Sequence, residues 1–185
     1  MLIGIYSPAP GCGKTTAAEY LMQHGFEPHS FATPIKEMTR RFLLSLGYDF
    51  HEAEKALIAK TTLIKGITPP ITVRDLLRTL ATEWGRDHVH PDVWLKCWRA
   101  KYDDLKFYGV NHIVVDDLRF PNEAQLITEL GGKLWELRRT DVEAIHQSTH
   151  RSDGGLTGYN FDKTIHNNGS IEALYAQLDH LISNQ

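Results

Sequence analysis

The sequence predicts an α/β fold with a mainly parallel sheet. Short apolar runs alternate with longer amphipathic segments along the chain, which is the order of parallel strands joined by crossover helices. A glycine-rich loop stands between the first apolar run and the first helical segment, and a later apolar run ends in two aspartates. The 185 residues have the length of one globular domain, so two independent enzymatic domains will not fit.

Four elements are predicted in the first quarter of the chain. Apolar runs indicate the strands, and Gly25 and Gly47 favour the ends of the two helices. Thr33 followed by Pro34 is typical of a helix start, with Thr33 as the N-cap. The four elements are a strand over 2–6, a helix over 14–24, a weaker strand over 26–31 and a helix over 34–46.

The middle of the chain is predicted to be helical, over 51–60, from Thr72 to about Arg86, and from Pro91 to Phe107. From Thr72 the apolar residues follow the spacing of one amphipathic helix, whose buried stripe ends at Trp84. Polar side chains step by four along its other side, at Arg74, Arg78, Thr82 and Arg86. They are interpreted either as a solvated face with local ion pairs or as a stripe that binds a dianionic phosphate.

The second half returns to strands. Strands are predicted over 113–117, 133–137 and 164–166, and helices over 122–130 and from Ile171 to Ile182. Between Arg138 and Tyr159 the chain has three glycines and little apolar periodicity. Long excursions of this kind in compact domains are often functional.

Composition excludes several classes of protein. The net charge of −3 argues against a protein that coats duplex nucleic acid, and no apolar run approaches the roughly 20 residues of a membrane span. Two cysteines make no disulfide framework, so we expect a cytoplasmic protein with reduced thiols. His146 and His150 lack the glutamate of a zinc-binding H-E-x-x-H motif.

The loop after the first strand has the composition of a phosphate-binding loop, or P-loop: Gly11-Cys12-Gly13-Lys14-Thr15-Thr16. Glycines let backbone N–H groups turn toward phosphate oxygens, and the helix N-terminus adds partial positive charge. Lys14 is predicted to bridge the outer phosphates of a nucleoside triphosphate, and the Thr15 hydroxyl to bind Mg²⁺. Pro8 stands where the P-loop motif expects its first glycine, so that end of the loop is stiffer than usual.

A second charged segment, Asp116-Asp117-Leu118-Arg119, follows the strand predicted over 113–117. Ligands of parallel sheets bind at the carboxyl ends of the strands. A carboxylate there can orient Mg²⁺ or position an acceptor, and Arg119 can bind the phosphate in transfer. The alternative is that the aspartates only suit the dipole of the helix that follows.

In these segments the chain resembles the bacteriophage-type deoxynucleoside monophosphate kinases, relatives of the adenylate and thymidylate kinase fold. The resemblance spans nearly the whole chain, and the order and spacing of its motifs carry it. The motifs are Gly13-Lys14-Thr15, Phe31-Ala32-Thr33-Pro34-Ile35-Lys36, the stretch from Arg78 to Arg86 with Trp94 downstream, Asp117-Leu118-Arg119-Phe120-Pro121-Asn122-Glu123, and Asn167-Asn168-Gly169-Ser170.

The resemblance implies a single three-layer P-loop kinase domain over 1–185, with a helical acceptor region over about 31–107 and a mobile lid over about 139–159. It implies transfer of the γ-phosphoryl group of ATP, with Mg²⁺, to a deoxynucleoside 5'-monophosphate. No nucleic acid polymer or membrane is expected as a partner, whereas a homodimer is compatible with the sequence. If the chain is of phage origin, its location is the host cytoplasm.

The resemblance also distributes roles among the residues. The catalytic residues are Lys14, Arg119 and Arg139. ATP is bound by Gly11, Cys12, Gly13, Lys14, Thr15, Thr16 and Asn167, and the acceptor by Phe31, Ala32, Lys36, Arg78, Thr82, Arg86, Trp94, Asp117 and Arg119. Thr15 and Asp116 bind the metal, although the sequence does not decide which of Asp116 and Asp117 lies nearer Mg²⁺. The lid segment His150-Arg151-Ser152-Asp153 has aspartate where the family has glutamate. Two alternatives are another small-acceptor kinase, similar to a dephospho-coenzyme A kinase, and a nucleotide-dependent switch ATPase.

Overall fold

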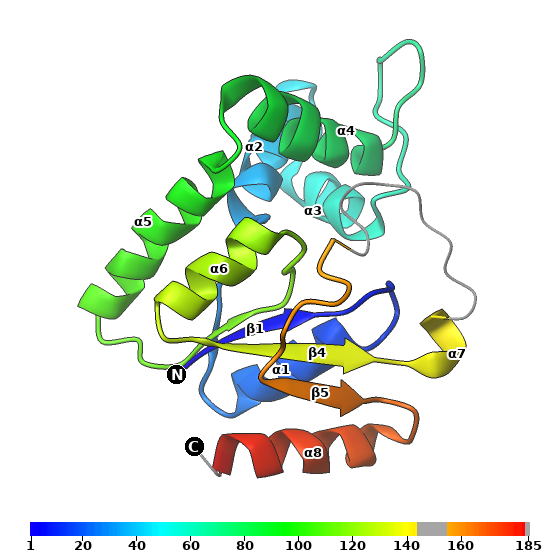
Figure 1. Ribbon diagram of the computed structural model, residues 1–185. Helices are drawn as coiled ribbons and strands as arrows, with labels where there is room; N and C mark the ends of the chain where they lie inside the picture. Colours follow the sequence, from blue (N-terminus) through cyan, green and yellow to red (C-terminus); the bar gives the residue numbers. More distant parts are fainter. Residues whose placement is uncertain (144–154, 184–185) are drawn as a thin grey trace. The chain divides into compact units, whose positions relative to one another are not determined.

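The chain forms two compact units in a computed structural model that describes residues 1–143 and 155–183. The first, here called the sheet unit, consists of Met1–Ser30 and Lys101–Gln185, and the second, the helical unit, of Phe31–Ala100. In Figure 1 all the strands belong to the sheet unit, together with several helices, whereas the helical unit contains helices and loops. One helix, α5 (Val93–Phe107), begins in the helical unit and ends in the sheet unit.

The sheet has five strands in the order β2-β3-β1-β4-β5, and every pair of neighbours is parallel. The strands are β1 (Leu2–Tyr6), β2 (Glu27–Pro28), β3 (Ile113–Val115), β4 (Lys133–Arg138) and β5 (Lys163–His166). The predicted fold class is therefore confirmed. The predicted strands over 26–31 and 113–117 are shorter than expected, and beyond them the Ser30 hydroxyl bonds the Asp116 carboxylate.

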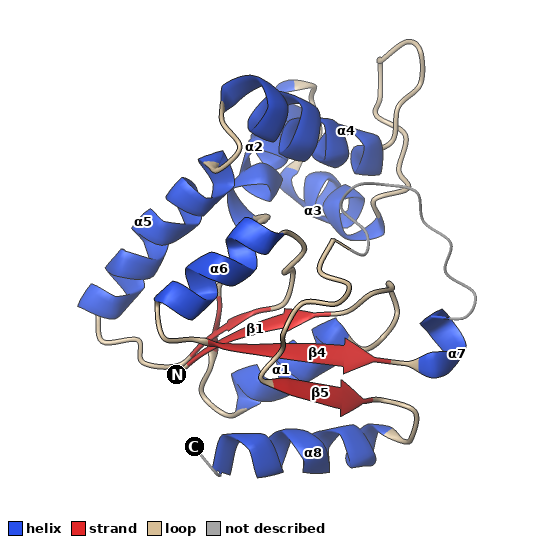
Figure 2. Cartoon of the chain, in the orientation of Figure 1, coloured by secondary structure: helices blue, strands red, loops and turns tan. Residues whose placement is uncertain are grey.

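Helices cover both faces of the sheet, so the sheet unit has three layers (Figure 2). Helices α1 (Lys14–Gln23) and α8 (Ile171–Ser183) pack on the face that carries Ile3, Ile5 and Trp135. Helix α6 (Pro121–Glu129) packs on the other face, against β1 and β4. A short helix, α7 (Thr140–Glu143), follows β4.

The helical unit has an apolar core of its own. It contains α2 (Thr33–Ser45), α3 (Phe50–Ala59), α4 (Val73–Thr79), a π-helix η1 (Leu80–Val89) and the first part of α5. Ala32 is the N-cap of α2, so Thr33 lies inside the helix rather than at its cap as predicted. The core residues, which come from α2, α3, α4 and the loops between them, are Leu43, Tyr48, Ala53, Ala56, Leu57, Ile64 and Val73.

The π-helix corrects the prediction of one continuous amphipathic helix from Thr72. In a π-helix each carbonyl accepts the N–H group five residues further along the chain, as the Gly85 carbonyl accepts the His90 N–H at 3.0 Å. A step of four residues then no longer returns to the same face. Thr82 and Arg86 are consequently buried instead of continuing the exposed side of Arg78, and Trp84, predicted to lie in the core, is 42% exposed.

Within the described part of the chain, no helix is long and apolar enough to cross a membrane.

Candidate functional site

The predicted site residues of the sheet unit follow the carboxyl ends of four parallel strands. The P-loop follows β1, Asp116 follows β3, Arg139 follows β4 and Asn167 follows β5. Since all the strands are parallel, these ends lie at one edge of the sheet. The topology thus collects residues that are far apart in the sequence.

The P-loop is shaped by two glycines and held from outside by Asn167. Gly11 and Gly13 have φ angles of 85° and 100°, a region that side chains disfavour. The buried Asn167 donates a hydrogen bond from Nδ2 to the carbonyl of Cys12 at 3.0 Å. A Cβ atom on Gly13 would lie only 2.5 Å from the same nitrogen. The predicted ATP-binding residue Asn167 therefore contacts the loop itself.

The predicted catalytic lysine is half-buried beside the loop. The Lys14 ammonium donates to the hydroxyl of Ser7, and that hydroxyl donates to the carbonyl of Ala9 at 2.7 Å. Burial lowers the pKa of Lys14, and the positive charge of Arg119 lowers it further, while Cys12, Asp116 and Asp117 act in the opposite direction. The positive charges of Lys14 and Arg119 therefore act on one another. Sequence reasoning missed Ser7, whose only signal is its place between β1 and the P-loop.

The acidic turn after β3 is held by two further residues. The Ser30 hydroxyl donates to Oδ1 of Asp116 at 2.6 Å. The buried Glu123 accepts the backbone N–H groups of Arg119 and Phe120 at 2.8 and 3.0 Å. Neither role was predicted, although Glu123 three residues after Phe120 has the spacing of a capping box.

The donor set fits a hard cation better than a soft one. The hydroxyl-bearing Thr15 is exposed, and Asp116 and Asp117 are half-buried. Among the described residues there is no group of three or more histidine, cysteine or acidic side chains that could hold a metal. Mg²⁺ keeps several waters and binds through one or two protein oxygens together with substrate phosphates, so a sparse set of oxygen donors suits it.

Arg139 directly precedes α7, a helix that contacts the P-loop through Val142. Its Nε donates to Asp141 at 3.1 Å, while the neighbouring Arg138 bonds Glu143 at 2.6 Å. A Cβ atom on Gly11 would lie 3.6 Å from Val142, which places α7 against the loop. The predicted lid continues through 144–154, including His150-Arg151-Ser152-Asp153, and this part lies outside the described residues.

The predicted acceptor residues belong mostly to the helical unit, where α5 brings several of them together. Trp94 bonds the Ala81 carbonyl at 2.7 Å, and a Cβ on Gly85 would lie 2.5 Å from its indole ring. One turn further along α5, Trp98 packs on Phe31 with ring centroids 5.1 Å apart. The buried Arg86 donates to the Pro91 carbonyl at 3.1 Å. The other predicted residues of this unit are the half-buried Ala32, the exposed Lys36 and Arg78, and the buried Thr82.

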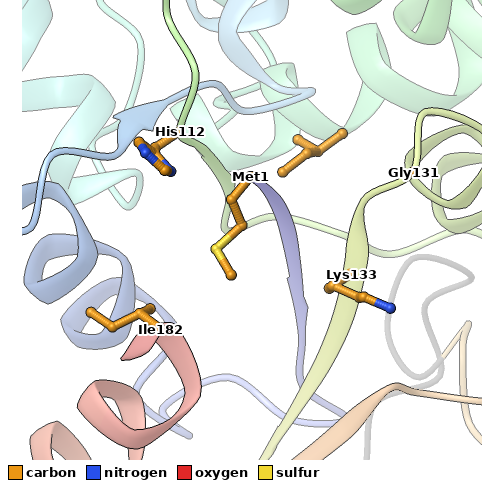
Figure 3. A pocket seen from close by; sticks show the side chains of 6 residues that line it. Met1, His112, Gly131, Lys133 and Ile182 are labelled. Carbon is orange, nitrogen blue, oxygen red and sulfur yellow. The ribbon is translucent and has the colours of Figure 1, made fainter. Parts of the chain in front are cut away.

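A separate pocket lies at the opposite edge of the sheet, where the strands begin. Figure 3 shows Met1, His112 and Ile182 around it, and Leu2, Gly131 and Lys133 complete the lining. None of the predicted site residues is among them.

A parallel sheet with a P-loop after its first strand and charged residues at the neighbouring strand ends is the arrangement of P-loop nucleotide-binding proteins. Two solved structures share the fold along nearly the entire chain: TT1252 from Thermus thermophilus (TM-score 0.55, 15% identity, 100% of this chain and 97% of that one) and the dephospho-CoA kinase from Campylobacter jejuni (TM-score 0.52, 15% identity, 99% and 96%).

The sequence itself identifies the family. The family model for deoxynucleotide monophosphate kinase matches residues 46–178. A putative deoxynucleotide monophosphate kinase of Acanthamoeba polyphaga mimivirus is 30% identical over 194 residues, covering 100% of this chain and 97% of that protein. The deoxynucleotide monophosphate kinase of Escherichia phage RB69 is 24% identical over 80% of this chain and 60% of its own length. The chain belongs to the deoxynucleotide monophosphate kinase family and is a phosphotransferase.

Proposed function

We propose that the protein transfers the γ-phosphoryl group of ATP to a deoxynucleoside 5'-monophosphate and so makes the diphosphate for DNA precursor synthesis. The observation that carries this proposal is that the P-loop with Lys14 follows β1 and the turn with Asp116, Asp117 and Arg119 follows β3, and that these two strands are parallel neighbours in the sheet. Membership of the family supports the class of acceptor. Viral and phage relatives support a location in the host cytoplasm.

The donor triphosphate is proposed to lie over the P-loop. Backbone N–H groups from Gly11 to Thr16 bind its phosphates, Lys14 bridges the outer ones, and Asn167 keeps the loop in shape. Thr15 and Asp116 are proposed to hold Mg²⁺, which when bound neutralises charge on the triphosphate oxygens. Asp117 is proposed to bind the acceptor.

Catalysis of phosphoryl transfer depends mainly on positioning of the substrates and on positive charge around the transferred group. Lys14 and Arg119 are proposed to supply that charge from the P-loop and the acidic turn. Arg139 is proposed to join them by exchanging its surface partner Asp141 for a phosphate oxygen. The lid over about 139–159 is proposed to exclude water from the reaction.

The acceptor is proposed to bind to the region over about 31–107, which includes the helical unit. Phe31, Ala32 and Lys36 are proposed to border it from the start of α2, and Arg78, Thr82 and Arg86 from α4 and the π-helix. Trp94 is only 3% exposed, with Gly85 packed against its ring, so its proposed contribution is to support this wall.

The test is an assay of ATP consumption and diphosphate formation against a panel of ribo- and deoxynucleoside monophosphates. The proposal predicts turnover that depends on a deoxynucleoside monophosphate and is abolished by Lys14→Ala. Dephospho-coenzyme A belongs in the panel, because turnover with that acceptor alone would assign the protein to another small-acceptor kinase. ATP hydrolysis that no acceptor stimulates would instead indicate a switch ATPase.

A further inference from the structure

We propose that Glu123 is a positioning residue that fixes Arg119 for catalysis, an inference that rests on the proposed function. Glu123 is a carboxylate in the third position of α6, and the residue as a whole is only 3% exposed. One of its oxygens, Oε2, accepts two successive backbone N–H groups, from Arg119 at 2.8 Å and from Phe120 at 3.0 Å.

One of these two bonds goes beyond what a helix cap requires. Phe120 is the N-cap of α6, so its N–H is the group that a capping-box glutamate normally accepts. The bond to Arg119 lies one residue further out, in the turn that leaves β3. This second bond satisfies no N–H group of the helix itself, and it restrains the backbone from which the Arg119 side chain projects.

Glu52 of α3 provides an internal comparison. It also stands at the third position of its helix and accepts the N–H of its N-cap residue, Asp49, at 3.1 Å. Its side chain is 43% exposed and pairs with Lys65 at 2.7 Å. The capping at α3 therefore works with a solvated carboxylate, whereas burying a carboxylate is costly unless it is well bonded. The second backbone hydrogen bond of Glu123 offsets part of the cost of burying its carboxylate.

The restraint acts on Arg119 from both sides. The preceding residue, Leu118, is 1% exposed and anchors the turn in the core, and Glu123 holds the following peptide. The Arg119 side chain is itself exposed, but its charge acts on Lys14 beside the P-loop. A fixed backbone reduces the conformational entropy that a long side chain loses when it binds the phosphate in transfer.

The experiment is a double-mutant cycle on turnover with ATP and the best deoxynucleoside monophosphate. Glu123→Ala is expected to lower kcat at least 10-fold, a factor in the range found for lost transition-state contacts, while the KM for ATP changes less than about threefold. Combining it with Arg119→Ala is expected to lower kcat no further than Arg119→Ala alone, within about twofold. Glu123→Gln is expected to keep most of the turnover, because one amide oxygen can accept both N–H groups.

A structural role would give a different pattern. Glu52→Ala removes a capping carboxylate as well, and any effect it has is expected to multiply with that of Arg119→Ala. If the effects of Glu123→Ala and Arg119→Ala also multiply, or if Glu123→Ala keeps the parental kcat, the positioning role is overturned. Should Glu123→Ala not fold, Glu123→Asp takes its place in the cycle, since the shorter carboxylate cannot reach both N–H groups.

The failure of this inference is distinguishable from failure of the proposed function. If the parent protein phosphorylates no monophosphate, the proposed function is wrong. The positioning of Arg119 is then decided by the NMR order parameter of its backbone N–H. Glu123→Ala is expected to lower that order parameter toward flexible values, below about 0.6, and an unchanged order parameter would overturn the inference.

Discussion

In its proposed role Lys14 must be charged to bind phosphate, although its surroundings disfavour the charge. Burial and Arg119 lower its pKa, so it loses its proton at a lower pH than an ordinary lysine. We expect kcat/KM for ATP to fall on the alkaline side below the pH at which ordinary lysines titrate. Arg119→Gln should move this limb to higher pH. An unmoved limb would show that another group titrates there.

The same shift has a consequence for stability. Because the folded state binds this proton more weakly than the unfolded state, the charged Lys14 destabilises the fold at every pH below its folded pKa, and the penalty disappears as the pH rises through the unfolded value. Lys14→Met is therefore expected to abolish turnover and yet raise the free energy of unfolding at pH 7 in the absence of nucleotide. Urea unfolding at pH 7 measures the gain in stability, and urea unfolding in the alkaline range measures its disappearance.

Arg119 and Arg139 are expected to act on the transferred phosphoryl group more than on bound ATP. Changing either to alanine should lower kcat by roughly 10²-fold or more, and raise the Kd for ATP by less than about fivefold. Stopped-flow turnover and direct titration of ATP separate the two quantities. Parental turnover in either variant would remove that residue from the proposed mechanism.

Gly13 combines two requirements that an alanine cannot meet. Its φ of 100° disfavours any side chain, and a Cβ would lie 2.5 Å from the amide of Asn167. Gly13→Ala is expected to cost about 1–3 kcal/mol of stability and to weaken ATP binding at least 10-fold. Isothermal titration and urea unfolding check the two effects.

Gly109→Ala is the matched control, with a φ of 83° and, among the described residues other than its chain neighbours, no atom within 4 Å of its Cβ position. It should show the backbone strain of about 1 kcal/mol without a change in ATP affinity. Equal ATP affinities of the two variants would mean that the contact with Asn167 does not shape the loop.

Among the helices, the π-helix η1 depends on close packing between Gly85 and Trp94. A Cβ at position 85 would lie 2.5–2.6 Å from three atoms of the indole ring. We expect Gly85→Ala to cost about 1–3 kcal/mol and to raise the KM for the monophosphate several-fold, because Arg86 follows directly. The KM for ATP should stay near the parental value, and Trp94→Phe should restore part of the loss in the double variant.

This helix also shows where sequence-based prediction stops. The apolar spacing from Val73 to Trp84 fits an ordinary α-helix, and nothing within the segment indicates a change of hydrogen bonding at Leu80. A residue outside the segment, Trp94, bonds the Ala81 carbonyl and packs against Gly85. The alternation of strands and helices, by contrast, is written in local patterns, so the parallel sheet was predictable although two strands are shorter.

The candidate site also has a part that the sequence predicts and a part that it does not. The P-loop was predictable because its residues are consecutive and follow a strand directly. The bonds that hold it and its neighbours join residues far apart, Asn167 to Cys12 across 155 positions and Ser30 to Asp116 across 86. Those contacts follow from strand order, which a single sequence does not specify.

For the molecule as a whole, two apolar cores correspond to the two proposed tasks. Leu21 is fully buried in the core of the sheet unit, which presents the P-loop, and Leu43 is fully buried in the core of the helical unit. Truncating a buried leucine to alanine costs about 2–5 kcal/mol wherever it lies. The two substitutions therefore make equal chemical changes in different units.

We expect Leu43→Ala to weaken monophosphate binding while ATP binding at low temperature is retained, and Leu21→Ala to weaken both. The reason is that the sheet unit has its own core and does not need Leu43, whereas the residues proposed to bind the acceptor include Arg119 and Asp117 of the sheet unit as well as residues of the helical unit. Titration with a fluorescent ATP analogue and with the monophosphate, alongside urea unfolding, measures all three properties. If Leu43→Ala lost ATP affinity in proportion to its lost stability, the two units would unfold as one cooperative body, and the proposed division of tasks would not extend to stability.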